Sequence, residues 1–365
     1  EKEEMERAIL EQSPIWKYKF FVQRRAANTY KPDQAAALDR GSLTMAVTEL
    51  RNNAFDFTLV YDEELGIATM ASKLIEADEA LAKGDEPTAS VRETVANITR
   101  AYEKLKDRPF GGVFADYVLK AGDAGGDLLT VKAALGIVEA WSAIEFYKKE
   151  RRWKAFKVPH ALDYQSLVQL IRPEPEFENV MRGRDEDMRR RVGFKLTDDR
   201  GTMRDALYEI DYCMICHERE KDACRTGLHE KDGSIHRNPL GIKTEGCPLD
   251  ERISEMHMLK GQGDPIGSLA LVTIDNPMCA GTGHRICNDC MKGCIFQKQE
   301  PVNIPLAETA TLTDVLAMPY GFEIYSLLTR WNPLNAKRPY ALPYNGKNVM
   351  VVGLGPAGYT LAQYL

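Results

Sequence analysis

The chain has 365 residues, of which 44% are hydrophobic and 28% charged, and it carries a formal net charge of −6. This is the composition of a folded globular protein, and the acidic balance argues against a nucleic-acid-binding protein. No apolar run approaches the roughly 20 residues that a membrane-spanning helix needs, so we expect no transmembrane segment.

Residues 1–205 are expected to form a helical domain, although the sequence does not reveal its role. Helix-forming residues dominate and β-branched residues are few over residues 1–12, 34–51 and 63–83. Ser90 and Glu93 have the spacing of a capping box, followed by an apolar stripe at helical spacing. Asp127 is expected to cap a longer helix with a broad apolar face, which we interpret as the central helix of this domain.

A basic tract follows this helix at residues 148–154. We interpret it as a solvated helix end, where cations complement the helix dipole, and a docking patch for an acidic electron-transfer partner is the alternative. His160, in Val158-Pro159-His160, is interpreted as structural because no partner motif accompanies it.

All eight cysteines fall within residues 213–294, and none precedes this stretch. They are Cys213, Cys216, Cys224, Cys247, Cys279, Cys287, Cys290 and Cys294. Eight thiols suffice for two four-cysteine sites, and the short steps between neighbouring cysteines let their sulfurs converge on one metal centre.

Several interpretations of these cysteines remain open. Scattered core cysteines would not cluster in this way, and a disulfide framework suits smaller secreted chains. Two structural zinc sites are a real alternative. Cys213-Met-Ile-Cys216-His217 also matches the c-type haem attachment pattern, although haem would leave six cysteines unexplained.

Iron–sulfur clusters explain the whole set best. The spacing of Cys287, Cys290 and Cys294 is similar to part of a ferredoxin-type ligand run, in which the last cysteine often ligates the other cluster. Pro248 follows Cys247 directly, which is a recurring ferredoxin feature, and it also suits the first turn of a helix expected over residues 249–259.

The C-terminal residues change character after a linker at residues 331–344. An apolar strand is expected at residues 348–352, directly before Gly353-Leu-Gly355-Pro356-Ala357-Gly358 and a helical run to Leu365. This is the context that a dinucleotide-binding fingerprint requires, in which the glycines allow a tight turn and close approach of the pyrophosphate. The acidic residue that should hold the ribose would come later, so we expect this to be a fragment cut early in a flavin-binding domain.

Several motifs, taken together, make the region from Tyr212 onward similar to a known protein family. They are Asp275-Asn-Pro277, Gly283-His-Arg-Ile-Cys287, Cys290-x3-Cys294, Glu300-Pro-Val-Asn-Ile304, Glu308 and the Gly353–Gly358 turn. This block resembles the small subunit of NADPH-dependent glutamate synthase, and it is similar to the N-terminal part of dihydropyrimidine dehydrogenase. The resemblance implies an α-helical domain with two [4Fe-4S] clusters, followed by a Rossmann-type FAD domain.

The resemblance also implies a ligand partition. Cys213, Cys216, Cys224 and Cys294 would hold one cluster, and Cys247, Cys287 and Cys290 most of the other. Its fourth ligand is expected to be Cys279, with Glu308 as the alternative that matches an oxygen ligand of the family. The chain departs from the family by an insertion at residues 225–246, in which His229 and His236 are interpreted as loop residues.

The expected protein is therefore mainly α. A helical domain of unknown role spans residues 1–205, the cluster domain residues 206–330, and a linker with the first strand and helix of a truncated Rossmann-type FAD domain residues 331–365. We expect a cytoplasmic NAD(P)H-dependent iron–sulfur flavoprotein that passes electrons through two [4Fe-4S] clusters and FAD to a redox partner protein or catalytic subunit. The alternatives are a zinc-stabilised interaction module and a docking subunit of a larger redox complex.

Overall fold

A computed structural model of the chain is mainly helical, which confirms the expected fold class at that level. It divides into two compact units, Glu1–Val158 and Pro159–Leu365, whereas the sequence places a boundary near residue 205. The structure describes residues 13–54, 62–84, 86–105, 111–121, 126–185, 188, 191–195, 201–282, 286–335 and 343–365. The helix expected over residues 1–12 lies outside these ranges.

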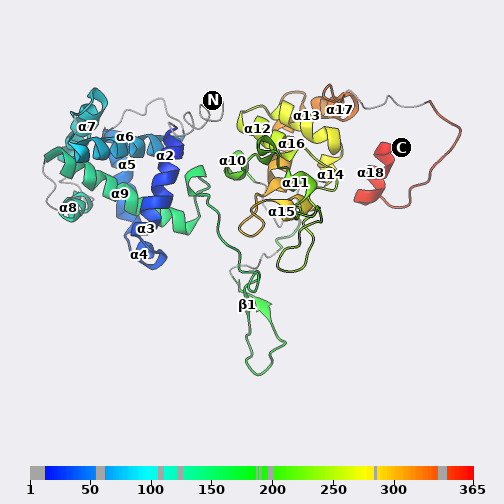
Figure 1. Ribbon diagram of the computed structural model, residues 1–365, viewed down its shortest axis with the longest axis horizontal. Coiled ribbons are helices and arrows are strands. Elements are labelled where there is room, and N and C mark those ends of the chain that lie inside the picture. Colours follow the sequence, from blue (N-terminus) through cyan, green and yellow to red (C-terminus); the bar gives the residue numbers. More distant parts are fainter. Residues whose placement is uncertain are drawn as a thin grey trace. The chain divides into compact units, whose positions relative to one another are not determined.

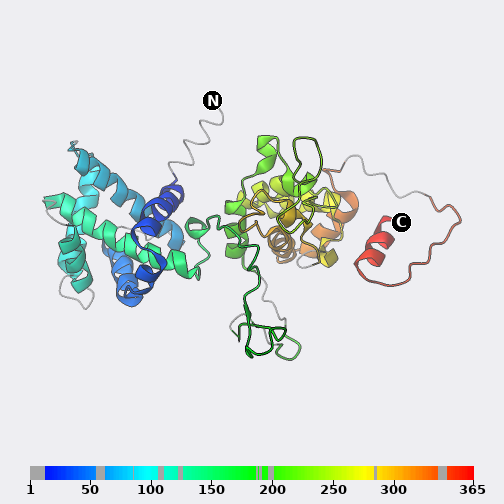
Figure 2. The same cartoon turned by 60° about the horizontal axis from the view of Figure 1, so that its bottom comes forward.

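The first unit is built around the helix α9 (Gly126–Lys148), as the sequence predicts. Its sequence supplies an almost continuous set of small and branched apolar residues, so that from Val131 to Phe146 nearly every side chain is buried. Helices α5 to α8 pack against it (Figures 1 and 2). The elements of this unit are α2 (Pro14–Phe21), a π-helical turn η1 (Val22–Ala26), α3 (Ala27–Thr29), α4 (Pro32–Ala36), α5 (Arg40–Ala54), α6 (Glu63–Lys83), α7 (Ala89–Leu105), α8 (Gly111–Lys120), α9 and a 3-10 turn η2 (Lys154–Phe156).

Two of the expected helix caps are wrong by two residues. Helix α7 begins at Ala89, and the hydroxyl of Thr88 accepts a hydrogen bond from the Val91 amide, so Thr88 caps this helix and Ser90 lies inside it. Asp127 likewise lies in the first turn of α9 and does not precede it. Threonine and serine are nearly equivalent as caps, so the local sequence does not distinguish the two positions.

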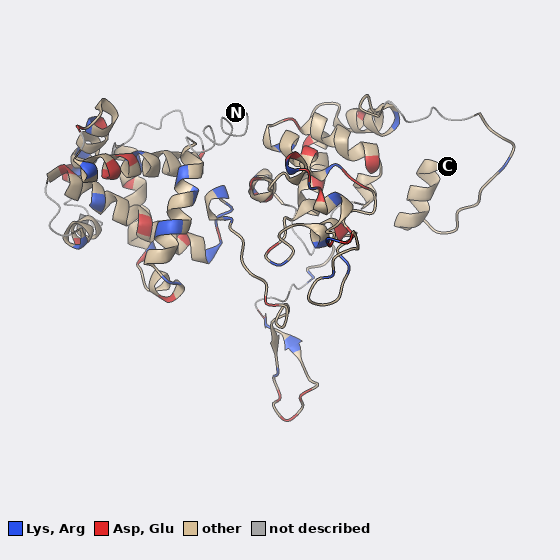
Figure 3. Ribbon diagram, viewed as in Figure 1, with Lys and Arg blue, Asp and Glu red and all other residues tan. Residues whose placement is uncertain are grey.

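A buried carboxylate near the end of α9 binds one arginine of the basic tract. Glu145 is fully buried, and Arg40 donates to it through two nitrogens at 2.7 and 3.1 Å. The Arg151 Nε atom donates to the same carboxylate at 3.0 Å, and its guanidinium lies over the rings of Trp141 and Trp153. The interpretation of the basic tract as a solvated helix end is therefore wrong for Arg151, which is part of the packed structure. Figure 3 shows acidic and basic segments interspersed along the helices of this unit.

The second unit contains a helical core (Figure 1), and most of its cysteines belong to this core. Its elements are β1 (Leu170–Ile171), β2 (Arg182–Gly183), α10 (Met203–Tyr212), the 3-10 turn η4 (Cys216–Arg219), α11 (Ala223–Thr226), α12 (Ile253–Gly261), α13 (Pro265–Asp275), α14 (Cys279–Thr282), α15 (Asp289–Gly293), α16 (Ile304–Leu316), α17 (Gly321–Trp331) and α18 (Pro356–Tyr364). Helices α12, α13 and α16 pack against one another at its centre. The helix that was expected to start beside Pro248 begins only at Ile253, because residues 247–250 form a turn closed by the Asp250 amide and the Cys247 carbonyl.

The segment from β1 to β2 and the segment that follows residue 343 leave apolar side chains exposed. Strands β1 and β2 pair antiparallel, with Leu170 opposite Gly183. The strand expected at residues 348–352 is not formed within the described chain: this segment is extended but pairs with no other strand, and Met350 and Val352 are more than 85% exposed. An apolar strand needs neighbours to hydrogen-bond and to bury it, and among the described residues no strand lies beside this segment.

Among the described residues, none of the helices combines the length and the apolar character that crossing a membrane requires.

We expect the Glu145→Ala substitution to destabilise the first unit by about 3 kcal/mol, because it leaves Arg40 and Arg151 without their buried counter-charge. Urea unfolding followed by tryptophan fluorescence would measure this loss, since Trp16, Trp141 and Trp153 all lie in this unit. Glu150→Ala is the matched control: Glu150 also pairs with Arg40, but its side chain is 57% exposed. That variant should lose less than about 1 kcal/mol, and equal losses in the two variants would contradict the prediction.

Candidate functional site

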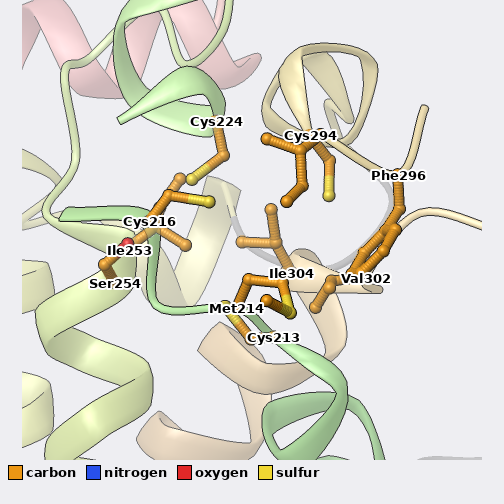
Figure 4. A pocket seen from close by; sticks show the side chains of 11 residues that line it. Cys213, Met214, Cys216, Cys224, Ile253, Ser254, Cys294, Phe296, Val302 and Ile304 are labelled. Carbon is orange, nitrogen blue, oxygen red and sulfur yellow. The ribbon is translucent and has the colours of Figure 1, made fainter. Parts of the chain in front are cut away.

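Four thiols from separate elements surround one cavity (Figure 4). Cys213 caps the end of α10, Cys216 begins η4, Cys224 lies in α11, and Cys294 follows α15. Apart from Ser254, the other residues that line the cavity are apolar: Met214, Ile253, Ile295, Phe296, Val302 and Ile304. The structure therefore brings together the four cysteines that the family resemblance assigns to one cluster.

Local backbone geometry directs these sulfurs inward. Ile215 has a left-handed backbone conformation with φ of +46°, which is uncommon for a β-branched residue and reverses the chain between Cys213 and Cys216. Its amide lies 3.5 Å from the Cys213 Sγ atom, as an N–H···S contact requires. The strained turn places two thiols of one Cys-x2-Cys step at the same cavity.

Burial raises the pKa of each thiol in this group above its ordinary value. The pKa of Cys213 rises to about 12, first because the thiol is buried and then because Cys294 and Cys216 add negative charge. Burial raises the pKa of Cys224 further, and those of Cys216 and Cys294 also rise. No basic side chain lines the cavity. A bound cation would supply the missing positive charge and convert the thiols to thiolate ligands.

The other four cysteines gather around two buried carboxyl groups. Burial is the main cause that raises the pKa of Cys290, and the charges of Cys247, Glu251 and Glu308 follow. Burial likewise raises the pKa of Cys247 to about 11 and that of Cys279 to about 12, and it raises the pKa of the exposed Cys287. The charge of Glu308 raises the pKa of Cys279, Cys287 and Cys290, and the charge of Glu251 raises the pKa of all four thiols.

The two carboxyl groups share one amide side chain. The Asn276 Nδ2 atom donates to a Glu308 carboxylate oxygen at 3.2 Å, and the Asn276 side chain is also hydrogen-bonded to Glu251. Burial raises the pKa of Glu251 to about 7, and burial together with the charge of Glu251 raises the pKa of Glu308. The carboxyl of Glu308 thus lies near the second group of cysteines. An oxygen atom that replaced Cys279 as a metal ligand would have to lie there.

The two groups are joined directly through the backbone. The Cys247 amide donates to the Cys224 carbonyl at 2.8 Å, and Cys290 and Cys294 lie one helical turn apart at α15. Gly293, between them, packs so tightly that an added Cβ would lie 2.4 Å from the Ala223 carbonyl oxygen and 2.9 Å from the Gly246 Cα atom. Helix α15 therefore fixes one cysteine of each group relative to the other.

His217, considered above as a haem ligand, faces two carboxylates. Its Nδ1 atom lies 3.4 Å from Asp222 and its Nε2 atom 3.7 Å from Glu255. These three side chains offer ligand atoms within 4.8 Å of one another, and nowhere in the described chain do three cysteine sulfurs lie this close. The imidazole is thus directed at carboxylates, and its two preceding cysteines share their cavity with two further thiols.

The glycine-rich turn adopts the conformation that its sequence predicts. Gly353 has a positive φ of +101°, and Pro356 is the first residue of α18. A Cβ at Gly358 would lie 2.1 Å from the Gly353 carbonyl oxygen, whereas one at Gly355 would meet nothing within 4 Å. The open space at Gly355 is where the fingerprint places a pyrophosphate, and Ala357 lies in the same first turn of the helix.

Sequence reasoning missed several residues of the site. Glu251 follows Cys247 by only four positions and could have been noticed. Asn276 lies in the Asp275-Asn-Pro277 motif, but the sequence did not predict that its side chain joins two carboxyl groups. Residues 283–285 of the family-like block lie outside the described residues. His229 lies in the insertion as expected, and the nearby His236 pairs with Glu230 at 2.5 Å.

Comparison with known proteins adds relatives but no function. No family model matches the chain, and no solved structure does. An uncharacterized protein of Rickettsia prowazekii (strain Madrid E) is 60% identical over 88 residues, which cover 24% of this chain and 12% of that protein. A second uncharacterized protein of the same strain is 37% identical over 79 residues, which cover 20% of this chain and 27% of that protein. The chain thus spans only a small part of the curated relatives that it matches.

We expect the Gly293→Ala substitution to reduce metal binding at both thiol groups, because the added methyl group forces α15 away from the Ala223 carbonyl. The expected cost in stability is about 1–3 kcal/mol. Metal content per chain after anaerobic reconstitution, measured beside the circular dichroism spectrum, checks this prediction. Gly183→Ala is the control, since a Cβ there meets nothing within 4 Å. Full metal content in the Gly293 variant would contradict the prediction.

Proposed function

We propose that the second unit is an electron-relay module of an iron–sulfur flavoprotein oxidoreductase, similar to the small subunit of glutamate synthase. The observation that carries this proposal is the cavity enclosed by Cys213, Cys216, Cys224 and Cys294. Its lining of four thiols and otherwise mainly apolar side chains suits a [4Fe-4S] cluster, which binds four thiolates and is shielded from water. The second cysteine group is proposed to hold a second cluster.

A zinc ion and a four-iron cluster require different spacings of their sulfur ligands. Tetrahedral zinc with Zn–S bonds of about 2.3 Å places its four sulfurs only about 3.8 Å apart. In the described chain no three cysteine sulfurs lie within 4.8 Å of one another. A four-iron cluster binds each thiolate through a different iron atom, so its ligands stand farther apart. A zinc ion in the cavity would therefore require its thiols to lie closer together than they do in this structure.

The protein contributes ligands and hydrogen bonds, whereas a bound cluster would supply one-electron chemistry and FAD would supply the two-electron exchange with NAD(P)H. Backbone amides favour the charged sulfurs: those of Leu249 and Glu251 lower the pKa of Cys247, and those of Phe296 and Val302 lower the pKa of Cys294, against the effect of burial. These amides stabilise negative charge on the thiolates and so help to set the reduction potentials. No side chain has to act as an acid or a base for this relay.

The direct backbone contact between the two groups supports transfer between the clusters. Cys224 of the first group and Cys247 of the second are joined by one hydrogen bond of 2.8 Å. Cys290 and Cys294 provide a second connection of one helical turn at α15. Electrons that enter one cluster would therefore have a short, rigid path to the other.

In this proposal Gly353, Gly355, Pro356, Ala357 and Gly358 form the pyrophosphate-binding turn of an FAD domain. The positive φ of Gly353 and the open space at Gly355 fit this role. The hydride exchange and the terminal reaction would take place outside the residues described, and an interacting redox protein or catalytic subunit would complete the path. The free thiols suit a reducing compartment, so we propose a cytoplasmic location.

We expect the chain, purified anaerobically, to contain about eight iron and eight sulfide per molecule, with broad visible absorption that bleaches on reduction with dithionite. Iron, sulfide and zinc analysis beside the visible spectrum is the measurement. About two zinc ions per chain and no colour would reject the relay in favour of the zinc-stabilised module.

Single cysteine variants should separate the two groups. Cys224→Ser removes a ligand of the first group and should lower the iron content by up to half, and Cys290→Ser should do the same for the second group. The double variant should lose both clusters. Thr226→Ser, also in α11 but outside the cavity lining, is the control and should retain full iron. If either single variant kept full iron content, the assignment of its cysteine as a ligand would be wrong.

A further inference from the structure

Three side chains beside the first thiol group lie close together, and none of them is a cysteine. They are His217 in η4, Asp222 directly before α11 and Glu255 in the first turn of α12. One possible metal-ligand atom of each residue lies within 4.8 Å of those of the other two. A single ion bound to one nitrogen of the imidazole could therefore contact both carboxylates.

Backbone hydrogen bonds hold these side chains near one another. The Glu220 amide donates to the His217 carbonyl at 3.1 Å, and Glu220 has a left-handed conformation with φ of +56°. The chain therefore turns back after η4, and this turn brings Asp222 beside the imidazole. The His217 amide donates to the Ser254 Oγ atom at 3.4 Å. This second hydrogen bond ties η4 to the first turn of α12, where Glu255 lies.

The two carboxylates lack the partners that buried oxygen atoms normally have. The Asp222 Oδ1 atom and the Glu255 Oε2 atom are buried, and neither has a hydrogen-bond partner within the described chain. Asp222 stands at the capping position of α11, but its side chain makes no capping hydrogen bond. Arg225 lies 3.8 Å from the other Asp222 oxygen, which is too long for a hydrogen bond. Buried polar atoms nearly always have a partner, and a bound cation would supply one to both oxygens.

The distances around the imidazole are longer than those of hydrogen bonds. The Nδ1 atom lies 3.4 Å from Asp222 and the Nε2 atom 3.7 Å from Glu255, whereas N–H···O bonds measure about 2.7–3.2 Å. Metal–ligand bonds of about 2.1 Å hold adjacent ligand atoms about 3.0 Å apart in an octahedral site and about 3.4 Å apart in a tetrahedral one. The Asp222 separation has this size, and rotation of the longer Glu255 side chain brings its carboxylate to the same ion.

We propose that His217, Asp222 and Glu255 form a site for one divalent transition-metal ion, separate from the cysteine cavity. Imidazole and carboxylate groups together suit such an ion. The His217 side chain is 53% exposed, so water completes the coordination. The ion would join η4 and α11, which carry Cys216 and Cys224 of the cavity, to α12. The inference does not depend on the proposed function, because none of the three ligands is a cysteine.

The test uses Mn²⁺ as the probe, because carboxylate oxygens suit this ion and thiolates select softer ones. The full chain, purified anaerobically, is titrated with Mn²⁺, and free Mn²⁺ is counted by electron paramagnetic resonance. We expect one bound Mn²⁺ per wild-type chain, and at least about tenfold weaker binding in Glu255→Gln and in His217→Gln, since even an outer-shell partner contributes that much. Glu218→Gln is the matched control. It removes a charge from the same turn, but Glu218 does not belong to the group, so binding should be unchanged.

Circular dichroism and iron content separate loss of the ion from loss of the fold. Glu255→Gln should keep the wild-type values of both, and Mn²⁺ should raise the melting temperature of the wild type but not of this variant. If Glu255→Gln misfolds, the more exposed His217→Gln decides.

Two results would overturn the inference. One is a wild-type chain that binds no Mn²⁺, and the other is a folded Glu255→Gln or His217→Gln variant that binds it as tightly as the wild type does. A chain without iron that still binds one Mn²⁺ through Glu255 would support this site and overturn only the electron relay.

Discussion

Burial of thiols with no basic side chain lining their cavity is the constraint on which the cysteine-rich core of the second unit depends. The pKa values of Cys213, Cys247 and Cys279 are raised to about 11 or 12 by burial and by neighbouring negative charge. Such thiols stay protonated unless a cation joins them, so the fold brings the groups together in a form that a metal centre would stabilise. Short helices, tight turns and close glycine contacts hold the sulfurs in these positions.

The first unit meets a related electrostatic problem with side chains alone. Its central helix buries Glu145, and Arg40 and Arg151 supply the compensating charge within 3.1 Å. Because these partners are side chains of the same unit, the buried charge of Glu145 is balanced without a bound cation. In the first unit, arginine side chains neutralise the buried carboxylate. In the second unit, thiols and mainly apolar side chains line the cavity, and no basic side chain is among them.

Local pattern predicted much of the fold, and it was wrong where several local solutions are nearly equal in energy. The span of α6 matched the expected helix, and the burial of α9 followed from its composition. The cap of α7 was misplaced because Thr88 and Ser90 are both good caps. The strand expected at residues 348–352 does not pair, since strand pairing depends on distant partners and not on local propensity.

The sequence by itself determined that eight cysteines gather in one region and that a glycine-rich turn opens the last helix, because ligand types, spacing and glycine conformation are local properties. Only the tertiary structure decided which thiols share a cavity, since Cys224 and Cys294 are seventy positions apart in the chain. It also decided that the Asn276 side chain joins the carboxyl groups of Glu308 and Glu251. Those contacts come from the packing of helices distant in sequence, and no short motif encodes such packing.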